Sequence, residues 1–384
     1  MTEEIKEEKL NIICSQESLS NGIQTVQKAI SSRGITLPIY SGILLEAEED
    51  NKVHLFATDL EIGIDCYIPA QVIEKGSIVL SNKILSNLIR KLPGGNIEIQ
   101  NKKEHTTTIK QGNSKYKILG FSAEEFSSFP EIGIKSKIKL SQKVLKGAIE
   151  QIIFAISKDE NRAFLSGAYF SIKDNEFQIT ATDSHRLSTK KIIKTKGMED
   201  CGVIVPYRAL SELQKLLSGQ DDVFVEINLD ERQILFVLYP GEEKQGIRLV
   251  SRLIQGEFPN FEQIIPKDFK TEIKVETEEF MEKMERISIF TEEEVGMVKM
   301  QIKNDEIILN IESSNIGEAY EKVKCSKTGD DLDITFNSKY ILDILKVINS
   351  ENANIKFNGN LNPVIVVPEK DEGYLCVIMP IRSE

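Results

Sequence analysis

Residues 177–188 read FQITATDSHRLS. Phe177, Ile179 and Ala181 alternate with polar residues, which is the two-residue period of a strand with one buried face. Asp183 then starts a tight turn, because an aspartate side chain can hydrogen-bond to the backbone two residues further on. The stretch therefore predicts a strand, a turn and the start of a second strand.

This stretch has two further copies in the chain. VHLFATDLEIGI occupies 53–64 and repeats its Ala-Thr-Asp core, and a weaker copy, ILNIESSNIGEAY, occupies 308–320. The intervals from Asp59 to Asp183 and from Asp183 to Ser313 are 124 and 130 residues, so the 384-residue chain holds three such periods. A fixed interval of this kind indicates repeated structural units.

Other segments keep the same spacing. SQESLSNGIQTVQKAIS (15–31) aligns without a gap on SQKVLKGAIEQIIFAIS (141–157), and ETEEFMEKMERISIFTE (276–292) supplies a third amphipathic helix pattern. We therefore expect a flexible extension and three domains, with the boundaries 1–9, 10–131, 132–266 and 267–384.

Each period contains two helix patterns separated by short alternating stretches. The predicted helices are 17–31, 81–92, 141–157, 206–217, 277–290 and 338–348. Ser81 has the residue type of a helix N-cap, and Pro206 suits a first helical position. Strands are predicted in the segment that follows each helix. The only strand predicted immediately before a helix is LNIIC, which begins at Leu10. The expected fold class is α+β, with two helices of each domain packed on antiparallel sheets.

Composition indicates a globular, multi-domain protein. Hydrophobic residues make up 40% and charged residues 28% of the chain, which is ordinary for a folded protein. No run of about 18 apolar residues and no basic-then-apolar leader occurs, so we expect neither a membrane span nor a secretion signal, and a cytoplasmic location. The five cysteines are scattered and never form a C-x-x-C pair. We expect buried or reduced thiols, with no zinc site and no other cofactor.

Catalytic motifs are weak. His185 stands close to Asp183, as in some hydrolases, but neighbouring residues in a turn rarely converge and no nucleophile motif accompanies them. His185 fits a turn residue equally well. His54 and His105 stand alone in strand patterns and are expected at the surface. No P-loop, G-x-G-x-x-G or H-E-x-x-H motif occurs, so the pattern favours a binding or scaffold protein without catalytic residues.

The charge is unevenly distributed. The net charge is −12 and the pI about 5.1, which argues at first against a nucleic-acid ligand. The six predicted helices with the residues at their ends, counted as 17–33, 81–91, 141–158, 206–217, 277–291 and 337–348, together carry +6, however, so the rest of the chain carries −18. If all six helices share one face, that face is far less acidic than the other. Scattered charges on solvated helices would give the same count.

In this order and spacing, a set of short motifs carries a resemblance to a known family. The motifs are TLPIYSGILLE (36–46), ATDLEIGI (57–64), LPGG after helix 81–92, ATDSHRLS (181–188), GEFPNFEQIIP (256–266) and MPIR (379–382). The chain resembles the bacterial sliding clamps, the beta subunits of DNA polymerase III, from Leu10 to Arg382. The resemblance implies a closed ring of two head-to-tail subunits that encircles duplex DNA without sequence preference. It also implies a non-catalytic processivity factor that serves the polymerase III catalytic subunit, the clamp loader, and other polymerases and repair proteins.

The resemblance also implies three groups of site residues. The expected DNA contacts inside the ring are Arg33, Lys83, Lys158 and Phe164, although Arg33 could be a simple helix-end charge, and the residues around Asp159 and Ala163 depart from some relatives. The expected pocket for partner peptides comprises Leu165, Thr182, Ser184, His185, Arg186, Leu187, Pro259, Gln263, Ile264, Leu361, Pro363, Val377, Ile378, Met379, Pro380, Ile381 and Arg382. The expected dimer contacts are Leu88, Leu92 and Tyr116 against Ile289 and Phe290.

Each group has an alternative interpretation. The MPIR stretch could be an ordinary strand end, and the dimer residues could belong to the core. Gln263 and the tail Ser383-Glu384 differ from some relatives and imply an altered motif preference. For the whole chain, two other functions are compatible with the sequence, namely an interaction scaffold that never meets DNA and a hydrolase that uses Asp183 and His185.

Overall fold

A computed structural model describes residues 10–31, 37–47, 51–103, 106–133, 136–159, 161–194, 200–239, 246–291, 296–313 and 315–382. The chain divides into two compact units. Unit 1 contains the residues up to Lys143 together with Ser211–Leu253, and unit 2 contains Val144–Leu210 together with the residues from Ile254 onward. The central repeat thus contributes to both units.

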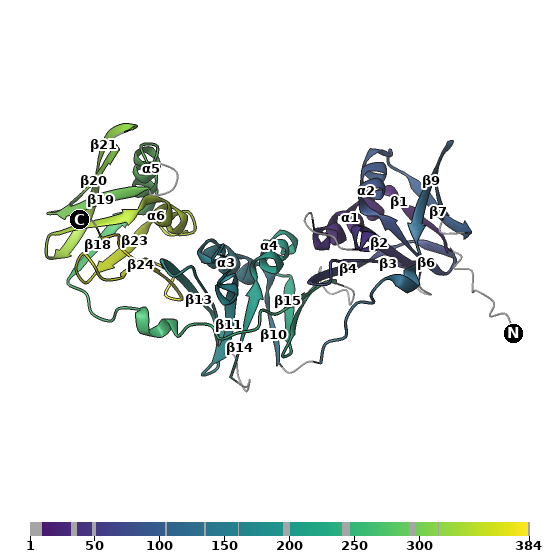
Figure 1. Ribbon diagram of the computed structural model, residues 1–384, viewed down its shortest axis with the longest axis horizontal. Coiled ribbons are helices and arrows are strands. Elements are labelled where there is room, and N and C mark those ends of the chain that lie inside the picture. The colour runs from purple at the N-terminus through teal and green to yellow at the C-terminus, as the bar shows by residue number, and fades with distance from the viewer. Residues whose placement is uncertain are drawn as a thin grey trace. The chain divides into compact units, whose positions relative to one another are not determined.

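The described residues include six α-helices, all at predicted positions (Figure 1). They are α1 (Gln16–Val26), α2 (Asn82–Lys91), α3 (Gln142–Ile152), α4 (Tyr207–Leu216), α5 (Thr277–Ser288) and α6 (Ser338–Leu345). Two of them end earlier than predicted because the chain tightens into a 3-10 turn, at Gln27–Ala29 after α1 and at Ile153–Ala155 after α3. No helix in the described part of the chain has the length and apolar character needed to cross a bilayer.

All strands of unit 1 form one antiparallel sheet of 13 strands. In spatial order they are β10 (Ser136–Ser141), β15 (Phe224–Leu229), β16 (Gln233–Leu238), β17 (Ile247–Arg252), β4 (Ile62–Pro69), β3 (Lys52–Thr58), β2 (Gly42–Ala47), β6 (Gly76–Ser81), β9 (Ser114–Phe121), β8 (Thr106–Gln111), β7 (Asn96–Lys103), β1 (Leu10–Ser15) and β5 (Gln71–Glu74).

Unit 2 contains a second antiparallel sheet, of 12 strands. In spatial order they are β14 (Cys201–Pro206), β11 (Gly167–Lys173), β12 (Glu176–Thr182), β13 (Arg186–Lys194), β25 (Tyr374–Ile378), β24 (Val364–Pro368), β23 (Asn352–Phe357), β18 (Thr271–Glu276), β21 (Gly317–Gly329), β20 (Glu306–Ser313), β19 (Met297–Lys303) and β22 (Leu332–Asn337). The α+β class with two helices in each of three repeats is therefore confirmed.

Five strands that directly precede a helix were missed by the sequence patterns, namely β6, β10, β14, β18 and β22, as was the short β5. Each of the five has only six residues, and its last residue carries the signal for the helix that follows. One such signal was misread. Pro206 ends β14 and α4 starts at Tyr207, so the prediction of Pro206 as a helical residue is wrong.

Helix caps are more varied than the sequence indicated. Ser81 stands at the N-cap of α2, but its side chain makes no cap hydrogen bond. Ser15 does cap α1 by accepting a hydrogen bond from the backbone of Ser18, and Glu276 caps α5 in the same way. Such caps satisfy backbone N–H groups that have no partner within the helix.

The amphipathic helices cover the sheets with their apolar faces. In the third repeat, α5 buries Phe280, Met284 and Ile287, which confirms the amphipathic pattern predicted for this segment. Figure 1 shows α5 and α6 side by side in the C-terminal part of the chain, where their buried residues share one core. Burial of each such side chain contributes about 1.5–3 kcal/mol.

A buried ionic cluster lies in unit 1, where the sequence predicted a surface histidine. His54 is buried, its Nε2 lies 2.9 Å from Asp65 Oδ2, and its Nδ1 lies 3.4 Å from Glu46 Oε2. Arg248 on β17 also donates to Asp65, at 3.0 and 3.1 Å from its Nε. The expectation for His54 is wrong because β2 and β4, which flank its strand, bring it the charged partners Glu46 and Asp65. His105 lies outside the described residues.

Sheets continue from one repeat into the next at two joints. In unit 1, β4 pairs with β17, and in unit 2, β13 pairs with β25. Each joint begins at one of the two Ala-Thr-Asp turns, because β4 and β13 are the strands that leave these turns. The repeated sequence element thus lies where neighbouring repeats meet.

Candidate protein-docking and DNA-contact sites

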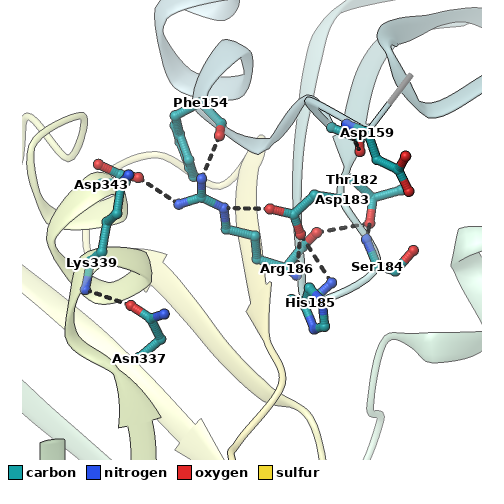
Figure 2. A network of polar contacts seen from close by, with 11 residues as sticks. Phe154, Asp159, Thr182, Asp183, Ser184, His185, Arg186, Asn337, Lys339 and Asp343 are labelled. Carbon is teal, nitrogen blue, oxygen red and sulfur yellow. Dashed lines mark hydrogen bonds and ion pairs between the residues drawn. The ribbon is translucent and has the colours of Figure 1, made fainter. Parts of the chain in front are cut away.

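Figure 2 shows the turn that joins β12 to β13 in unit 2. Asp183 Oδ1 accepts hydrogen bonds from the backbone N–H groups of His185 and Arg186, at 3.0 and 2.9 Å. Thr182 Oγ1 donates to the Arg186 carbonyl at 2.7 Å and accepts from the Ser184 N–H at 3.2 Å. Ser184 has a φ of 77°, in the left-handed region that tight turns use. These bonds hold the turn rigid.

Arg186 points inward from this turn. Its Nε lies 3.1 Å from Asp183 Oδ2, its Nη1 2.6 Å from Asp343 Oδ2, and its Nη2 2.6 Å from the Phe154 carbonyl. The guanidinium also lies over the ring of Phe154 (Figure 2) and over that of Tyr340. Arg186 is therefore a positioning residue that fixes the turn to α6, and its donors are engaged within the protein.

The predicted peptide pocket separates into a buried floor and an exposed rim. The buried members are Leu165, Thr182, Arg186, Leu187, Val377 and Ile378. The exposed members are Ser184, His185, Pro259, Gln263, Ile264, Leu361, Met379 and Arg382, and the partly buried ones are Pro363, Pro380 and Ile381.

Register and packing bring part of this set together. Leu187 is paired with Val377 across β13 and β25, and both pack against Phe261. Phe261 begins the short 3-10 helix that carries Gln263 and Ile264. Met379 donates its backbone N–H to the His185 carbonyl at 2.8 Å. The sequence patterns did not identify Phe261 as a pocket residue, although it stands within the FPNFEQIIP motif.

Several large apolar side chains of the predicted pocket are exposed. The exposed fractions are 56% for Leu361, 45% for Ile264 and 38% for Met379. We call these three residues the apolar rim. Exposed apolar groups of this kind are typical of protein-interaction sites.

The geometry does not support a hydrolase. The Asp183 carboxylate is engaged by Arg186 and two backbone N–H groups, while the His185 ring lies against Tyr340 with centroids 6.2 Å apart. A catalytic His–Asp pair would require a hydrogen bond between the two side chains. The described residues also contain no group of three or more potential metal ligands.

The predicted DNA contacts lie on or near helices. Lys83 is exposed on α2, where Arg90 and Lys91 are also exposed, and Lys158 and Phe164 are exposed in unit 2. Arg33 lies outside the described residues. A groove of about 280 Å³ between α1 and α2 is lined by Ser20, Ile23, Gln24, Gln27, Ser86, Asn87, Ile89 and Arg90. Hydroxyl, amide and guanidinium groups of this kind can donate to phosphate oxygens.

The cationic side chains of α2 lack carboxylate partners among the described residues, whereas those of α5 have them. Among the described residues, no carboxylate forms an ion pair with Lys83, Arg90 or Lys91, whereas Lys283 pairs with Glu279 and Arg286 with Glu321. The α2 cations are thus available to an external anion.

Two strands in the interior of the sheets, β9 and β21, lack a partner along much of one edge within the described chain. β9 pairs with β8 along its length but with β6 only at Gly120 and Phe121, and β21 pairs with β18 only from Cys325 onward. Large apolar side chains are exposed on or beside these edges, with 76% of Leu119, 72% of Ile289 and 56% of Tyr320 exposed.

The five predicted dimer residues differ in burial. Ile289 is exposed, Leu88, Tyr116 and Phe290 are partly buried, and Leu92 is buried. An exposed, apolar strand edge is prone to pair with another chain.

Comparison with known proteins accounts for nearly all of the described chain. Residues 10–130, 139–260 and 262–382 match, in that order, the N-terminal, central and C-terminal domains of the DNA polymerase III beta subunit. The chain is 34% identical to the beta sliding clamp of Staphylococcus epidermidis, over 94% of this chain and 97% of that protein. The chain belongs to the beta sliding clamp family.

Solved structures of sliding clamps share the fold. The DNA polymerase sliding clamp from Bacillus subtilis is 32% identical, with a TM-score of 0.91, over 98% of this chain and 100% of that chain. The DNA polymerase III beta subunit from Thermotoga maritima is 25% identical, with a TM-score of 0.87, over 98% of this chain and 100% of that chain. The resemblance seen in the sequence is confirmed.

Membership settles the general type of function. Beta sliding clamps are non-catalytic processivity factors of DNA polymerase III, so the prediction that the chain is not an enzyme is confirmed. The family binds DNA and polymerase III and forms homodimers. The individual site residues remain predictions.

Proposed function

We propose that two copies of this chain associate head to tail into a closed ring that encircles duplex DNA in the cytoplasm. The ring tethers the polymerase III catalytic subunit, the clamp loader, and other polymerases and repair proteins through short peptide motifs. In this proposal the domains are 10–131, 132–266 and 267–384, and residues 1–9, predicted from the sequence as a flexible extension, lie outside the described residues. The observation that carries the proposal is the presence of two apolar strand edges without partners, β9 in the first repeat and β21 in the third, in a chain of this family.

Ring closure follows from these two edges. If β9 of one subunit pairs with β21 of the other, both free rows of N–H and C=O groups are satisfied and Leu119, Ile289 and Tyr320 are covered. The contact is heterologous, and it closes after two copies when the rotation between subunits is a half turn. Leu88, Leu92, Tyr116, Ile289 and Phe290 are the proposed apolar contacts.

Weak DNA contacts suit a ring that must slide. A topologically closed ring needs little affinity for phosphates, and few phosphate contacts keep the binding sequence-independent. Lys83 and the neighbouring cations Arg90 and Lys91 are proposed to provide such contacts in unit 1, with Lys158 and Phe164 in unit 2. The acidic remainder of the chain would repel DNA from other surfaces.

Partner peptides are proposed to bind over the floor formed by Leu187 and Val377, between the residues of the apolar rim. Met379 offers a flexible, polarizable side chain that adapts to different apolar groups. His185 and Arg382 are exposed beside it and can bind polar atoms of the peptide.

Two measurements test the proposal. Sedimentation should give a species of twice the 43.4 kDa chain mass. After loading, the protein should remain on nicked circular DNA and dissociate when that DNA is linearised. A monomer at all concentrations, or equal loss from circular and linear DNA, would contradict the ring.

A further inference from the structure

The turn at Thr58–Gly63 in unit 1 has the same construction as the turn in the predicted peptide pocket. Asp59 Oδ1 accepts from the N–H groups of Glu61 and Ile62, at 3.2 and 3.0 Å. Thr58 Oγ1 donates to the Ile62 carbonyl and accepts from the Leu60 N–H, both at 2.9 Å. The φ of Leu60 is 75°, against 77° at Ser184. All four hydrogen bonds of the unit 2 turn recur.

The strand beside this turn also repeats the arrangement. Gly63 is paired with Val250, as Leu187 is paired with Val377. Arg252 donates its backbone N–H to the Glu61 carbonyl at 2.9 Å, as Met379 does to the His185 carbonyl at 2.8 Å. Arg252 therefore takes the place that Met379 has at the other joint.

A pocket of about 190 Å³ lies at this position. Its lining residues are Phe56, Thr58, Leu60, Glu61, Ile62, Gly63, Ser127, Ser128, Pro130, Gln233, Val250 and Arg252. Phe56, Ile62 and Val250 are buried and form an apolar floor. Pro130 occupies the repeat position of Pro259.

Different side chains at two positions distinguish this pocket from the peptide pocket predicted in unit 2. The repeat spacing of 124 residues places Phe56 opposite Thr180 and Gly63 opposite Leu187. A Cβ atom at Gly63 would lie 3.0 Å from Val250 Cγ1 and 3.1 Å from Phe56 Cε2, so the glycine makes room for the phenylalanine ring. An aromatic ring thus lies in this floor at the repeat position where the other pocket has a threonine.

The rim also carries different polar groups. Glu61 and Arg252 form an exposed ion pair, with Oε1 and Nη1 3.3 Å apart. The Arg252 guanidinium can donate to a backbone carbonyl, and the Glu61 carboxylate can accept from a backbone N–H, which matches the two polar groups of an extended peptide. Because the two charges cancel, the rim suits an uncharged segment.

We propose that this pocket, defined by Phe56, Ile62, Val250, Glu61 and Arg252, is a second protein-docking site, which binds an uncharged, extended peptide segment through one aliphatic side chain. The site goes beyond the proposed function, and its existence does not depend on peptide binding at Met379. A subunit would then present two docking sites with different preferences.

The probe is N-acetyl-Leu-Leu-amide, which carries aliphatic side chains on an uncharged backbone. It is titrated into protein labelled at the Ile, Leu and Val methyl groups and followed by NMR. We expect saturable shifts of the Ile62 and Val250 methyl signals. Ser128→Trp, at the exposed mouth, should weaken these shifts at least about tenfold, since a bulky ring fills the entrance. Glu124→Trp, on the same segment but outside the pocket lining, should leave them unchanged.

A second variant tests recognition of the peptide backbone. Arg252→Met should weaken the apparent affinity for the probe about fivefold, because a charge-assisted hydrogen bond is lost. Isoamyl alcohol, which has the side chain of leucine without the backbone, should bind more weakly than the probe.

The inference is overturned if the Ile62 and Val250 signals do not move, if their shifts survive Ser128→Trp, or if isoamyl alcohol binds as well as the peptide. The Val377 and Leu187 signals report separately on the predicted pocket. If these signals do not shift while those of Ile62 and Val250 do, the predicted pocket is refuted and the second site is supported.

Discussion

At the residue scale, Arg186 and Asp65 show how single charged groups hold the joints between repeats. Arg186 connects Asp183, Asp343 and the Phe154 carbonyl in unit 2. His54 and Arg248 share Asp65 in unit 1. In both clusters a buried charge has opposite charges and hydrogen bonds around it, which is the condition for tolerating burial.

Replacing Arg186 by methionine should destabilise the protein by about 3 kcal/mol, since it leaves Asp183 and Asp343 without their cation. Urea unfolding followed by circular dichroism measures this effect. Arg252→Met removes an arginine from an exposed pair and should cost less than about 1 kcal/mol. Equal losses in the two variants would show that the Arg186 network adds no stability.

His54 should make stability depend on pH in the alkaline range. Burial alone would lower the pKa of His54, but hydrogen bonds to Asp65 and Glu46 outweigh it and raise the pKa to about 9. Since the ordinary value is 6.5, the charged form stabilises the fold fully below pH 6.5, and this contribution is lost as the pH rises through 9. The urea midpoint should therefore fall between pH 7 and 10, and His54→Gln should flatten this decline. An equally steep decline in the variant would contradict the assignment.

At the scale of elements, the strand ends decide which surfaces remain available. β25 ends at Ile378, and the chain continues as Met379, which is exposed while its backbone N–H is hydrogen-bonded to the His185 carbonyl. β9 and β21 each retain a free edge. These elements carry the two interaction surfaces of the proposed function.

Met379→Ala should weaken binding of a partner peptide about tenfold without altering sedimentation, because it removes apolar contact but keeps the backbone hydrogen bond. Met297→Ala is a suitable control, since Met297 is an exposed methionine on β19 that the predicted pocket does not include. Calorimetric titration measures both variants. Unchanged affinity in Met379→Ala would refute the pocket.

The combined change Ile289→Ala with Phe290→Ala should yield monomers, since it removes apolar area at the end of α5 beside the free edge of β21. Sedimentation velocity at several concentrations checks this outcome. Ile73→Ala, an equally apolar exposed residue on β5, should leave the dimer intact. A persistent dimer in the double variant would place the interface elsewhere.

At the scale of the whole molecule, a net charge of −12 coexists with a cluster of cations on α2 that have no carboxylate partners among the described residues. This distribution allows a protein that is acidic overall to contact DNA at one restricted surface.

Lys83→Ala combined with Lys91→Ala should weaken DNA binding and lower the slope of log affinity against log salt by about 2, since each phosphate contact releases about one counterion. Fluorescence anisotropy with a labelled duplex at several salt concentrations measures the slope. Lys322→Ala removes a lysine that is paired with Glu306 and should leave the slope unchanged. If the double variant has the same slope as the unmodified protein, α2 does not contact the DNA.

Much of the fold follows from local sequence patterns. The three periods, the six helices and most strands depend on apolar residues recurring at intervals of two or three to four, which neighbours along the chain determine. Short strands such as β14 were missed because six residues before a helix signal carry too little periodicity. The motif order of the whole chain also sufficed to place it among the sliding clamps.

Only the tertiary structure decided which side chains meet. His54 was expected at the surface, yet it is buried against Asp65. The register between β4 and β17 then places Arg248 on the same carboxylate, 183 residues away in sequence. Likewise, Arg186 was expected to face a peptide, and its partners Phe154 and Asp343 come from distant segments of unit 2. Such pairs depend on strand register and helix packing between remote segments, and these are set by the cooperative burial of the whole core, which no local pattern contains.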